Sequence, residues 1–548
     1  MSHAWIQDVS SLSETLLDSK KVEKRVGKCH LLLRKMQEKQ KIILVWYKRD
    51  LRISDHQPLT DALSLWESKG FPVLALYSFE PRVTSAPDFS DFHRQFIEES
   101  LIDLSELLHS IGIPIIIFER HISDVMKYIL ERYDVDSIFS HEETGNAITY
   151  ERDIMMGKYL MAKGIAWTEY PTNGVVRRLS SRDDWTRIWQ SRMMVPILPP
   201  PRWQEYWDTQ IAWDDWQRNI GNPYIQAGWE KEWQKTLASF LVSRGKKYMG
   251  GMSRPIEWQE ASSRISTYLA YGWVSLRQVV QMTWVRMQDL QRKWDTKFLR
   301  SLQAFHSRLH WQSHFIQKLE DEPRLESINA VKFYDTIRTL YDEDMMSAIE
   351  EARTGIPFID GIVRQLQATG WINFRARATL VSFVTCTCMQ PWQGRFAHWL
   401  ARLFTDYEPG IHYMQLQMQS GTMGINTIRI YNPMKQLHDK DSDGLFVDAY
   451  LPELAKLPKH LQSAPWEISE MESIEYGFVL GRDYPLPIID VESANRSARE
   501  ILYDMKSHID PRVKKAIVDK HASRKWAPRK TTKKKETQNP DTNLSLFD

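Results

Sequence analysis

The sequence predicts an α/β domain with a parallel, Rossmann-like sheet, followed by a large all-α domain. Between residues 41 and 172, five short apolar runs alternate with amphipathic segments of helical spacing. Apolar strands separated by helices are typical of βαβ units, in which helices cover both faces of a parallel sheet. From residue 231 to 511, by contrast, almost every periodic segment has helical spacing. The length of 548 residues also exceeds what one hydrophobic core normally supports.

The position of each apolar run predicts the individual strands and helices. The predicted strands of the α/β domain are 42–47, 72–79, 114–118, 137–139 and 166–170, and its predicted helices include 91–109 and 147–163. The predicted helices of the second domain include 229–244, 263–271, 301–319, 344–353, 358–368 and 375–386.

Three further segments separate or flank these two domains. Residues 1–40 are a polar N-terminal extension, for which a docked helix and a disordered lead-in are both open. Residues 173–230 are an interdomain connection, rich in Pro and Trp, that we expect to pack on the body through its aromatic side chains. Residues 512–548 are expected to be a basic, disordered tail. The tryptophans of the connection are Trp203, Trp207, Trp213 and Trp216.

The composition excludes several classes of protein. Hydrophobic residues make up 42% and charged residues 26%, which is too apolar for a disordered chain. No apolar run approaches the ~18 residues of a membrane span, and the polar first forty residues do not resemble a secretion signal. Cys29, Cys386 and Cys388 are too few for a disulfide framework or a four-thiolate site. We therefore expect a cytoplasmic protein with no membrane contact and no metal.

The charge is distributed unevenly. Residues 512–548 contain eleven Lys/Arg against four Asp/Glu, which leaves 61 basic and 66 acidic residues in the rest of the chain. A basic tail on a mildly acidic body suits a polyanion such as nucleic acid. A solvated tail that only aids solubility is the alternative.

Two segments of the helical domain carry candidate binding groups. The run SSRIS, residues 262–266, precedes a helical stretch, where hydroxyls, backbone N–H groups and an Arg suit a diphosphate; a plain helix N-cap is the alternative. Arg375 and Arg377 lie in an otherwise apolar helix, and a buried guanidinium needs a carboxylate, for which Asp406 is the candidate. An ordinary salt bridge in the core would have the same spacing.

The order of the motifs along the chain resembles the photolyase/cryptochrome family. WYKRDLRISDH (46–56) closes the first strand, and SSRIS is followed by LAYGWVS (269–275), TGWINFRAR (369–377), DYEPGIHYMQLQMQSG (406–421), TIRIYNP (427–433) and LPEL (451–454). The resemblance extends from about residue 42 to 506 and implies a helical domain that holds a U-shaped FAD. The three cysteines exclude the iron–sulfur members of the family.

The resemblance also implies which residues contact the flavin. A cationic Arg377, held by Asp406, would stabilise the anionic reduced flavin that serves as electron donor. His412 would face the N5 edge of the ring system. The residues that the family pattern assigns to the cofactor are Tyr248, Ser262, Ser263, Arg264, Ile265, Ser266, Trp371, Arg375, Arg377, Asp406, Glu408, His412 and Asn432.

In the repair enzymes of this family, excited reduced FAD gives an electron to a pyrimidine dimer flipped out of the duplex, the dimer splits and the electron returns. The resemblance implies Trp311, Arg377 and His412 as the catalytic residues. Simple core packing is the alternative for the pocket positions. The residues that would form the walls of the dimer pocket are Trp311, Phe374, Ala378, Leu416 and Met418.

The sequence departs from the family pattern at several of these positions. Phe374 and Ala378 replace both the Asn and Met of cyclobutane-dimer photolyases and the two His of (6-4) enzymes, which argues against (6-4) repair. Arg308 stands where a carboxylate usually precedes Trp311. Met414 replaces a Trp of the usual electron-transfer chain. A rerouted chain through Trp392, Trp399 and Tyr413 is therefore expected.

Two accessory features complete the expectations. The segment HEETG, residues 141–145, lies at a strand end, where a second antenna chromophore of unknown identity would bind. The chain ends NLSLFD, from Asn543 to Asp548, which resembles the peptide by which bacterial repair proteins hold the sliding clamp. Such short motifs also recur by chance.

Three functions remain open from the sequence. The first is light-driven, FAD-dependent repair of cyclobutane pyrimidine dimers in UV-damaged DNA by a monomeric photo-lyase, with single-stranded and double-stranded DNA both open as substrates. The second is a cryptochrome-type blue-light photoreceptor with little or no repair activity. The third is a nucleic-acid-binding protein with a vestigial flavin pocket. The altered pocket favours the second, whereas the basic tail and the clamp-like peptide favour the first.

Overall fold

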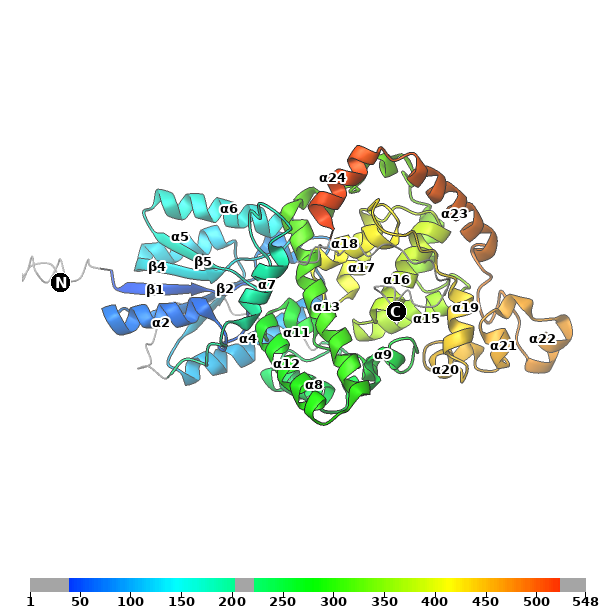
Figure 1. Ribbon diagram of the computed structural model, residues 1–548, viewed down its shortest axis with the longest axis horizontal. Coiled ribbons are helices and arrows are strands. Elements are labelled where there is room, and N and C mark those ends of the chain that lie inside the picture. Colours follow the sequence, from blue (N-terminus) through cyan, green and yellow to red (C-terminus); the bar gives the residue numbers. More distant parts are fainter. Residues whose placement is uncertain (1–38, 203–220, 523–548) are drawn as a thin grey trace, which may run out of the picture.

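The N-terminal domain contains one five-stranded sheet in which every strand pair is parallel (Figure 1). The computed structural model describes residues 39–202 and 221–522. The strand order is β3-β2-β1-β4-β5, and the predicted α/β class is confirmed. The strands are β1 (Lys41–Trp46), β2 (Val73–Ser78), β3 (Ile115–Phe118), β4 (Asp134–His141) and β5 (Ala166–Tyr170).

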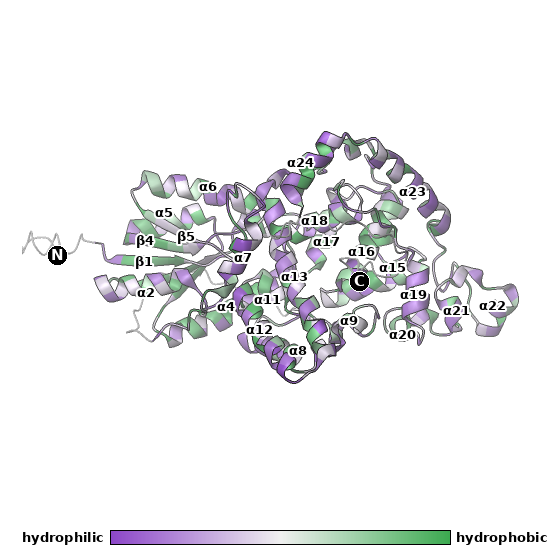
Figure 2. Ribbon diagram, in the orientation of Figure 1, coloured by the Kyte–Doolittle hydropathy of each residue, from purple (hydrophilic) through white to green (hydrophobic). Residues whose placement is uncertain are grey.

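Helices cover both faces of this sheet, because alternate side chains of β1 enter two different cores. Ile43 and Val45 pack with α2 (Gln57–Lys69) and α4 (Asp91–Ser110), whereas Ile42 and Leu44 pack with α5 (Ile122–Arg132) and α6 (Ala147–Ala162). In Figure 2, β1 is correspondingly hydrophobic along most of its length. The first of these cores continues into the helical domain, where it includes Leu302. A short helix, α3 (Pro81–Thr84), follows β2.

The connection between the domains contains a helix that the sequence did not predict, α7 (Trp185–Met194). Its Trp185 and Trp189 are buried, and the Trp189 indole N–H donates to the Ser313 hydroxyl at 3.2 Å. The tryptophans expected to pack on the body, Trp203 to Trp216, lie outside the described residues, as do nearly all of the N-terminal extension and the peptide from Asn543 to Asp548.

The second domain is helical, as predicted. Its central helix is α13 (Thr296–Asp321), which runs between the two domains in Figure 1. Helix α16 ends at Ser382, earlier than expected, and continues as a π-helical turn, Phe383–Thr387. The other helices are α8 (Glu230–Val242), α9 (Tyr248–Gly251), α10 (Trp258–Ala261), α11 (Ser266–Ala270), α12 (Leu276–Arg292), α14 (Glu343–Glu350), α15 (Pro357–Thr369), α16 (Phe374–Ser382), α17 (Arg395–Leu403), α18 (Pro409–Gln419), α19 (Pro433–Lys440), α20 (Leu445–Tyr450), α21 (Lys459–Gln462), α22 (Glu470–Tyr476), α23 (Val491–Ser507) and α24 (Pro511–His521).

The prediction that disorder begins at residue 512 is wrong for the first part of the tail, because α24 is a folded helix. Asp510 caps it by accepting from the Arg512 N–H at 2.7 Å, and Pro511 occupies its first position. At its end, His521 contacts the Glu322 carboxylate at 2.6 Å, next to the end of α13. Lys520 also pairs with Glu322 at 3.0 Å, so the body neutralises one lysine of this stretch.

None of the helices in residues 39–202 and 221–522 has the length and apolar character that crossing a bilayer requires.

Candidate cofactor and substrate site

A cavity of about 200 Å³ lies between α16, α17, the start of α18 and the loop that follows α15. Seven of the predicted site residues line it: Trp371, Phe374, Arg377, Asp406, Glu408, His412 and Leu416. The sequence reasoning missed the other residues of its wall, most of them apolar: Ile372, Val381, Leu400, Phe404, Tyr407, Ile411 and Gln415.

Gly370 brings the two halves of this cavity together. It ends α15 in the left-handed region, at φ 66°. Its carbonyl accepts from the Thr405 N–H at 2.9 Å, and a Cβ at this position would lie 2.1 Å from the Thr405 hydroxyl oxygen. Only glycine therefore allows the segment of Trp371 to lie directly against the segment of Asp406.

The expected ion pair between Arg377 and Asp406 is present in the cavity wall. Arg377 Nη2 lies 2.9 Å from each carboxylate oxygen of Asp406, and Arg377 Nε donates to the Ile372 carbonyl at 2.9 Å. The guanidinium also lies over the Phe404 ring, 3.9 Å from its centroid. Three contacts of different kinds thus hold this cation in one position.

A second guanidinium approaches the same wall from the SSRIS segment. Arg264 has φ 58°, and its guanidinium lies 4.0 Å from the centroid of the Trp371 ring. Burial lowers its pKa to about 10, while Asp406 opposes that shift. Its Nη1 is buried and has no hydrogen-bond partner among the described residues. An unpartnered buried donor on a cation fits an anionic ligand such as a diphosphate.

The rest of the SSRIS segment lies around Arg264 without lining the cavity. Ser262 is buried and its hydroxyl contacts the Met252 sulfur at 3.1 Å, and Ile265 belongs to the core of the first domain. Ser263 O lies near the Arg244 guanidinium at 3.5 Å, and Ser266 begins α11.

Three more predicted cofactor residues also lie outside the cavity wall. Tyr248 is buried between Phe240 and Phe305, and its hydroxyl bonds to Arg308. Asn432 caps α19 by accepting from the Lys435 N–H at 3.0 Å. Arg375, half-buried on α16, forms no ion pair with any carboxylate in residues 39–202 and 221–522. The cavity therefore takes only one of the two predicted arginines of this helix, since residues two apart on a helix point to different sides.

His412 is buried in the cavity wall and is neutral. Its Nε2 lies 3.0 Å from the Ala397 carbonyl oxygen, which can only accept, so Nε2 carries the proton and Nδ1 does not. Burial lowers the pKa of His412 to about 4. The rings of Tyr407 and Tyr413 pack edge-on against it, with centroids at 5.3 and 5.2 Å.

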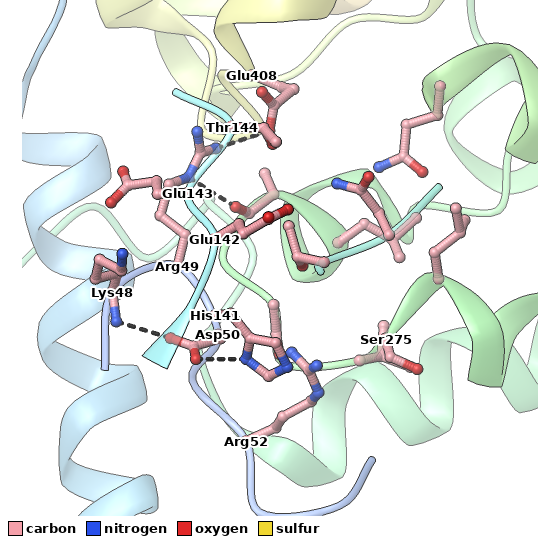
Figure 3. Close-up of a pocket in the computed structure, with 18 residues that line it drawn as sticks. Lys48, Arg49, Asp50, Arg52, His141, Glu142, Glu143, Thr144, Ser275 and Glu408 are labelled. Atoms are coloured by element: carbon pink, nitrogen blue, oxygen red, sulfur yellow. Dashed lines mark hydrogen bonds and ion pairs between the residues drawn. The ribbon is translucent and has the colours of Figure 1, made fainter. Parts of the chain in front are cut away.

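Arg49 connects Glu408 of the cavity wall to the N-terminal domain. Figure 3, a close-up of a neighbouring pocket that also includes Glu408, shows the Arg49 side chain pointing toward this carboxylate. Arg49 Nη2 lies 3.2 Å from Glu408 Oε2 and 2.9 Å from the Tyr407 carbonyl oxygen, and its Nε donates to the Ala270 carbonyl. Burial raises the pKa of Glu408, while Arg49 opposes that effect. The loop after β1 therefore supplies the countercharge of a buried carboxylate in the helical domain.

The predicted dimer-pocket residues are divided between two places. Phe374 and Leu416 line the cavity, whereas Ala378 and Met418 are buried and do not. Trp311 is half-buried on α13, packed against His314 with ring centroids 4.8 Å apart.

The predicted electron-transfer residues lie behind the cavity. Trp392 and Tyr413 are buried with ring centroids 6.4 Å apart, and the Trp392 N–H donates to Asn329 at 2.7 Å. The Tyr413 hydroxyl lies 3.4 Å from that of Tyr407, which in turn bonds to the Asp88 carboxylate at 2.7 Å. Trp399 stacks on Phe396 at 6.0 Å. Tyr407 was missed, although its position next to Asp406 was the available signal.

A second cavity, of about 120 Å³, opens at the carboxyl end of the sheet. Glu143 and Gly145 of the HEETG segment line it, together with Trp46, Tyr77 and Phe79. Tyr407 lines both cavities.

The first residue of that segment, His141, belongs to a buried cluster with Asp50 and His56, close enough together to hold a metal ion. Asp50 Oδ2 lies 2.7 Å from His141 Nδ1 and 2.9 Å from His56 Nε2. His56 Nδ1 accepts from the Leu59 N–H at 3.1 Å, so Nε2 must carry the proton of a neutral ring. Because that proton occupies the position a metal would need, we interpret the cluster as a hydrogen-bonded network that fixes the loop after β1.

Comparison with known proteins decides the family. Residues 43–182 match the family described as DNA photolyase, and residues 305–504 match the FAD binding domain of DNA photolyase. The chain belongs to the photolyase/cryptochrome family. The helical domain is accordingly an FAD-binding domain.

Proteins named as photolyases and proteins named as cryptochromes are both similar to the chain. A deoxyribodipyrimidine photo-lyase of Alkalihalophilus pseudofirmus is 23% identical and covers 83% of this chain and 96% of its own. A cryptochrome DASH of Gloeobacter violaceus is 26% identical, with coverage of 85% and 96%. The crystal structure of a class III photolyase from Agrobacterium tumefaciens superposes with a TM-score of 0.75 at 22% identity, covering 86% of this chain and 98% of its own. The similarity therefore does not distinguish repair from signalling.

Proposed function

We propose that the protein is a light-driven, FAD-dependent lyase that repairs cyclobutane pyrimidine dimers in DNA and acts as a monomer. The observation that carries this proposal is the cation of Arg377, fixed by Asp406 in the wall of a largely apolar cavity. When bound there, FAD in its reduced and light-excited form would supply the electron that splits the dimer. A photoreceptor of the same family is the alternative.

The residues of the cavity fit an anionic, planar cofactor. Arg264 offers a buried N–H without a partner, and Arg377 offers a positive charge that is already positioned before any ligand binds. Trp371 and Arg264, stacked on each other, would hold the diphosphate and adenine side of FAD. Arg377, Asp406 and His412 would flank the isoalloxazine.

Each of these side chains has a separate task. Arg377 keeps positive charge near the ring system, and Asp406 prevents that cation from turning away. His412 stays neutral at physiological pH because burial lowers its pKa to about 4. The hydrogen bond to the Ala397 carbonyl fixes the proton on Nε2. Phe374 and Leu416 exclude water from the side where a flipped base would enter.

The positive charge of the C-terminal residues favours repair over signalling. The chain carries a surplus of seven positive charges in residues 512–548, which suits a polyanionic substrate better than a protein partner. The apolar walls at Phe374 and Leu416 would suit the flat faces of a pyrimidine dimer. Phe374 and Ala378 depart from the Asn and Met of cyclobutane-dimer photolyases, and this departure favours the photoreceptor.

One assay separates the proposals. The reduced holoprotein is mixed with a UV-irradiated oligonucleotide, exposed to blue light, and recovered thymine is measured against a dark control. Light-dependent recovery supports repair. A yellow protein that bleaches reversibly without recovery supports the photoreceptor, and a protein that binds no flavin contradicts both.

The second cavity is our candidate for an antenna chromophore. Trp46, Tyr77 and Phe79 provide flat walls for a planar pigment, and Arg152 provides a cation, buried against Glu80 and Glu143. Mass spectrometry of molecules released from the native protein identifies the pigment. A Tyr77→Trp variant, which narrows the cavity, is expected to lose that pigment while retaining FAD.

The clamp interaction remains a proposal from the sequence, since residues 543–548 lie outside the described residues. A pull-down with the bacterial sliding clamp tests it. Loss of binding on deletion of residues 543–548 would support it, and unchanged binding would remove it.

A further inference from the structure

Trp294 is the most unusual exposed residue of the helical domain. Its side chain is 85% exposed in the turn between α12 and α13. Its backbone has φ 58°, a conformation that bulky residues rarely adopt and that glycine or asparagine would adopt at lower cost. Residues 291, 295 and 296 hold the turn through backbone hydrogen bonds of 2.9 to 3.3 Å. An indole presented to solvent in a disfavoured conformation calls for a functional explanation.

The turn that carries this indole is rich in basic residues. Arg292, two residues before Trp294, and Lys247, next to Lys246, are exposed, and neither forms an ion pair with a carboxylate of the described residues. Lys246 also lies here, 3.1 Å from Asp295, which caps α13. This arrangement, an exposed aromatic ring among cations, matches the sites that bind single-stranded nucleic acid without sequence preference.

The cations continue along one face of α13. Lys297, Arg300, Arg308 and Trp311 recur at spacings of three, eight and three residues, which places them within one narrow sector of the helix. Lys297 and Arg300 are exposed and have no carboxylate partner among the described residues, and Tyr248 holds Arg308. Another side of the same helix, at His310 and His314, is covered by Trp185 of α7. On the basic face, by contrast, Lys297 and Arg300 are exposed to solvent, and Arg308 and Trp311 are half-buried.

The length of this face fits a short stretch of DNA. Fourteen residues separate Lys297 from Trp311, which is about 21 Å along an α-helix. A single strand advances about 3.4 Å for each stacked nucleotide, so about six nucleotides would reach from Trp311 to Lys297. Trp294 lies three residues further along the chain, at a distance of about seven nucleotides.

We propose that the face of α13 formed by Lys297, Arg300 and Arg308, with Trp294 at its far end, binds the single-stranded flank of the DNA substrate. The inference rests on the proposed function, because it takes Trp311 as the residue at the lesion. The phosphates would follow the cations, and one base, about seven nucleotides from the lesion, would stack on the indole of Trp294. A duplex offers no free base face at that distance and would not use the indole.

Undamaged DNA tests this binding independently of repair. Fluorescence anisotropy of labelled dT16 with the holoprotein in the dark is measured for the wild type, Trp294→Ala and Trp294→Phe. We expect Trp294→Ala to weaken binding about tenfold and Trp294→Phe to retain most of it, as expected for base stacking. Tyr224→Ala, which removes another exposed aromatic ring (74% exposed), is the matched control and is expected to bind normally. Unchanged binding by Trp294→Ala would overturn the inference.

The cations are tested by salt dependence. Replacing both Lys297 and Arg300 with Gln is expected to reduce the slope of log affinity against log salt by about 1.4, because each phosphate contact to a single strand contributes about 0.7. An unchanged slope would contradict binding of the DNA phosphates by this face of α13. Tighter binding of a 16-base-pair duplex that is insensitive to Trp294→Ala would also contradict it.

Substrates with a central thymine dimer distinguish failure of the DNA-flank inference from failure of the proposed repair function. With flanks of three nucleotides, Trp294→Ala is expected to bind and repair like the wild type; with flanks of twelve, its affinity is expected to fall about tenfold. If Trp294→Ala has the same affinity as the wild type on both substrates, the inference about the face of α13 is overturned, but the proposed repair function is not. Absence of repair in all variants, with the Trp294 effect on dT16 retained, overturns the proposed function alone.

Discussion

The Arg377 guanidinium contacts both carboxylate oxygens of Asp406 at 2.9 Å, and this pair joins two segments that are 29 residues apart in the sequence. The Asp406 side chain is 5% exposed and that of Arg377 is 23% exposed. The charge pair is therefore largely shielded from water, and removal of either partner leaves a costly buried charge.

Asp406→Asn should weaken both folding and flavin binding. The substitution leaves Arg377 without its counterion, so we expect the free energy of unfolding of the apoprotein to fall by about 3 kcal/mol. We also expect bound FAD, measured by absorbance after gel filtration, to fall at least tenfold. Arg375→Gln is the control, because Arg375 lies on the same helix and forms no ion pair within the described part of the chain. Equal FAD retention in the two variants would argue against a role for the pair.

Acid should destabilise the protein through His412. Its pKa falls from the ordinary value of 6.5 to about 4 in the folded state, so the unfolded state binds more protons between these values. The stability from the neutral ring is fully present above pH 6.5 and is lost as the pH falls toward 4, by about 3 kcal/mol in total. In His412→Gln, which can still donate to Ala397, the loss of stability between pH 7 and pH 4.5 should be smaller by about 2 kcal/mol. Urea titrations at both pH values check this, and parallel curves for the two proteins would contradict it.

Arg49 and Glu408 should couple the two domains. Arg49→Ala leaves Glu408 buried and unpaired, and we expect a loss of about 3 kcal/mol in unfolding free energy. Adding Glu408→Gln should recover part of that loss, because a neutral amide does not need the countercharge. A double-mutant cycle with an interaction energy near zero would show that the contact contributes nothing.

Photoreduction of the flavin should depend on Trp392 and Tyr413. Their rings are 6.4 Å apart, so Trp392→Phe and Tyr413→Phe should each slow aerobic photoreduction at least tenfold. Met414, which stands where the family usually has a Trp, should tolerate replacement by Leu without effect. If Trp392→Phe is as fast as the wild type, Trp392 is not on the route. Trp399→Phe then shows whether the third expected residue participates.

The elements with strong burial patterns could be predicted from the sequence. The run 42–47 is apolar at every position because both faces of β1 are covered, and its prediction needed no tertiary information. The start of β4 was missed because Asp134 and Asp136 flank Val135 at the edge of the apolar run. Helix α24 was missed because its basic residues resemble a solvated tail, and only the structure shows that Lys520 and His521 at its end contact Glu322.

The site was predictable only where chemistry demanded a partner. A guanidinium in an apolar helix requires a carboxylate, which pointed to Asp406. Nothing in the sequence required Phe404 to lie under Arg377, or Arg49 of the first domain to pair with Glu408 of the second. Such contacts arise from the packing of segments distant in sequence, and no local pattern reports them.

The midpoint potential of the bound flavin in Arg377→Gln tests the central claim most directly. If FAD lies beside the Arg377–Asp406 pair, loss of the cation destabilises the anionic reduced form, and the potential should fall by about 60 mV or more, which corresponds to a tenfold change for one electron. Arg375→Gln should leave the potential unchanged. A potential in Arg377→Gln equal to that of the wild type would show that the flavin is bound elsewhere.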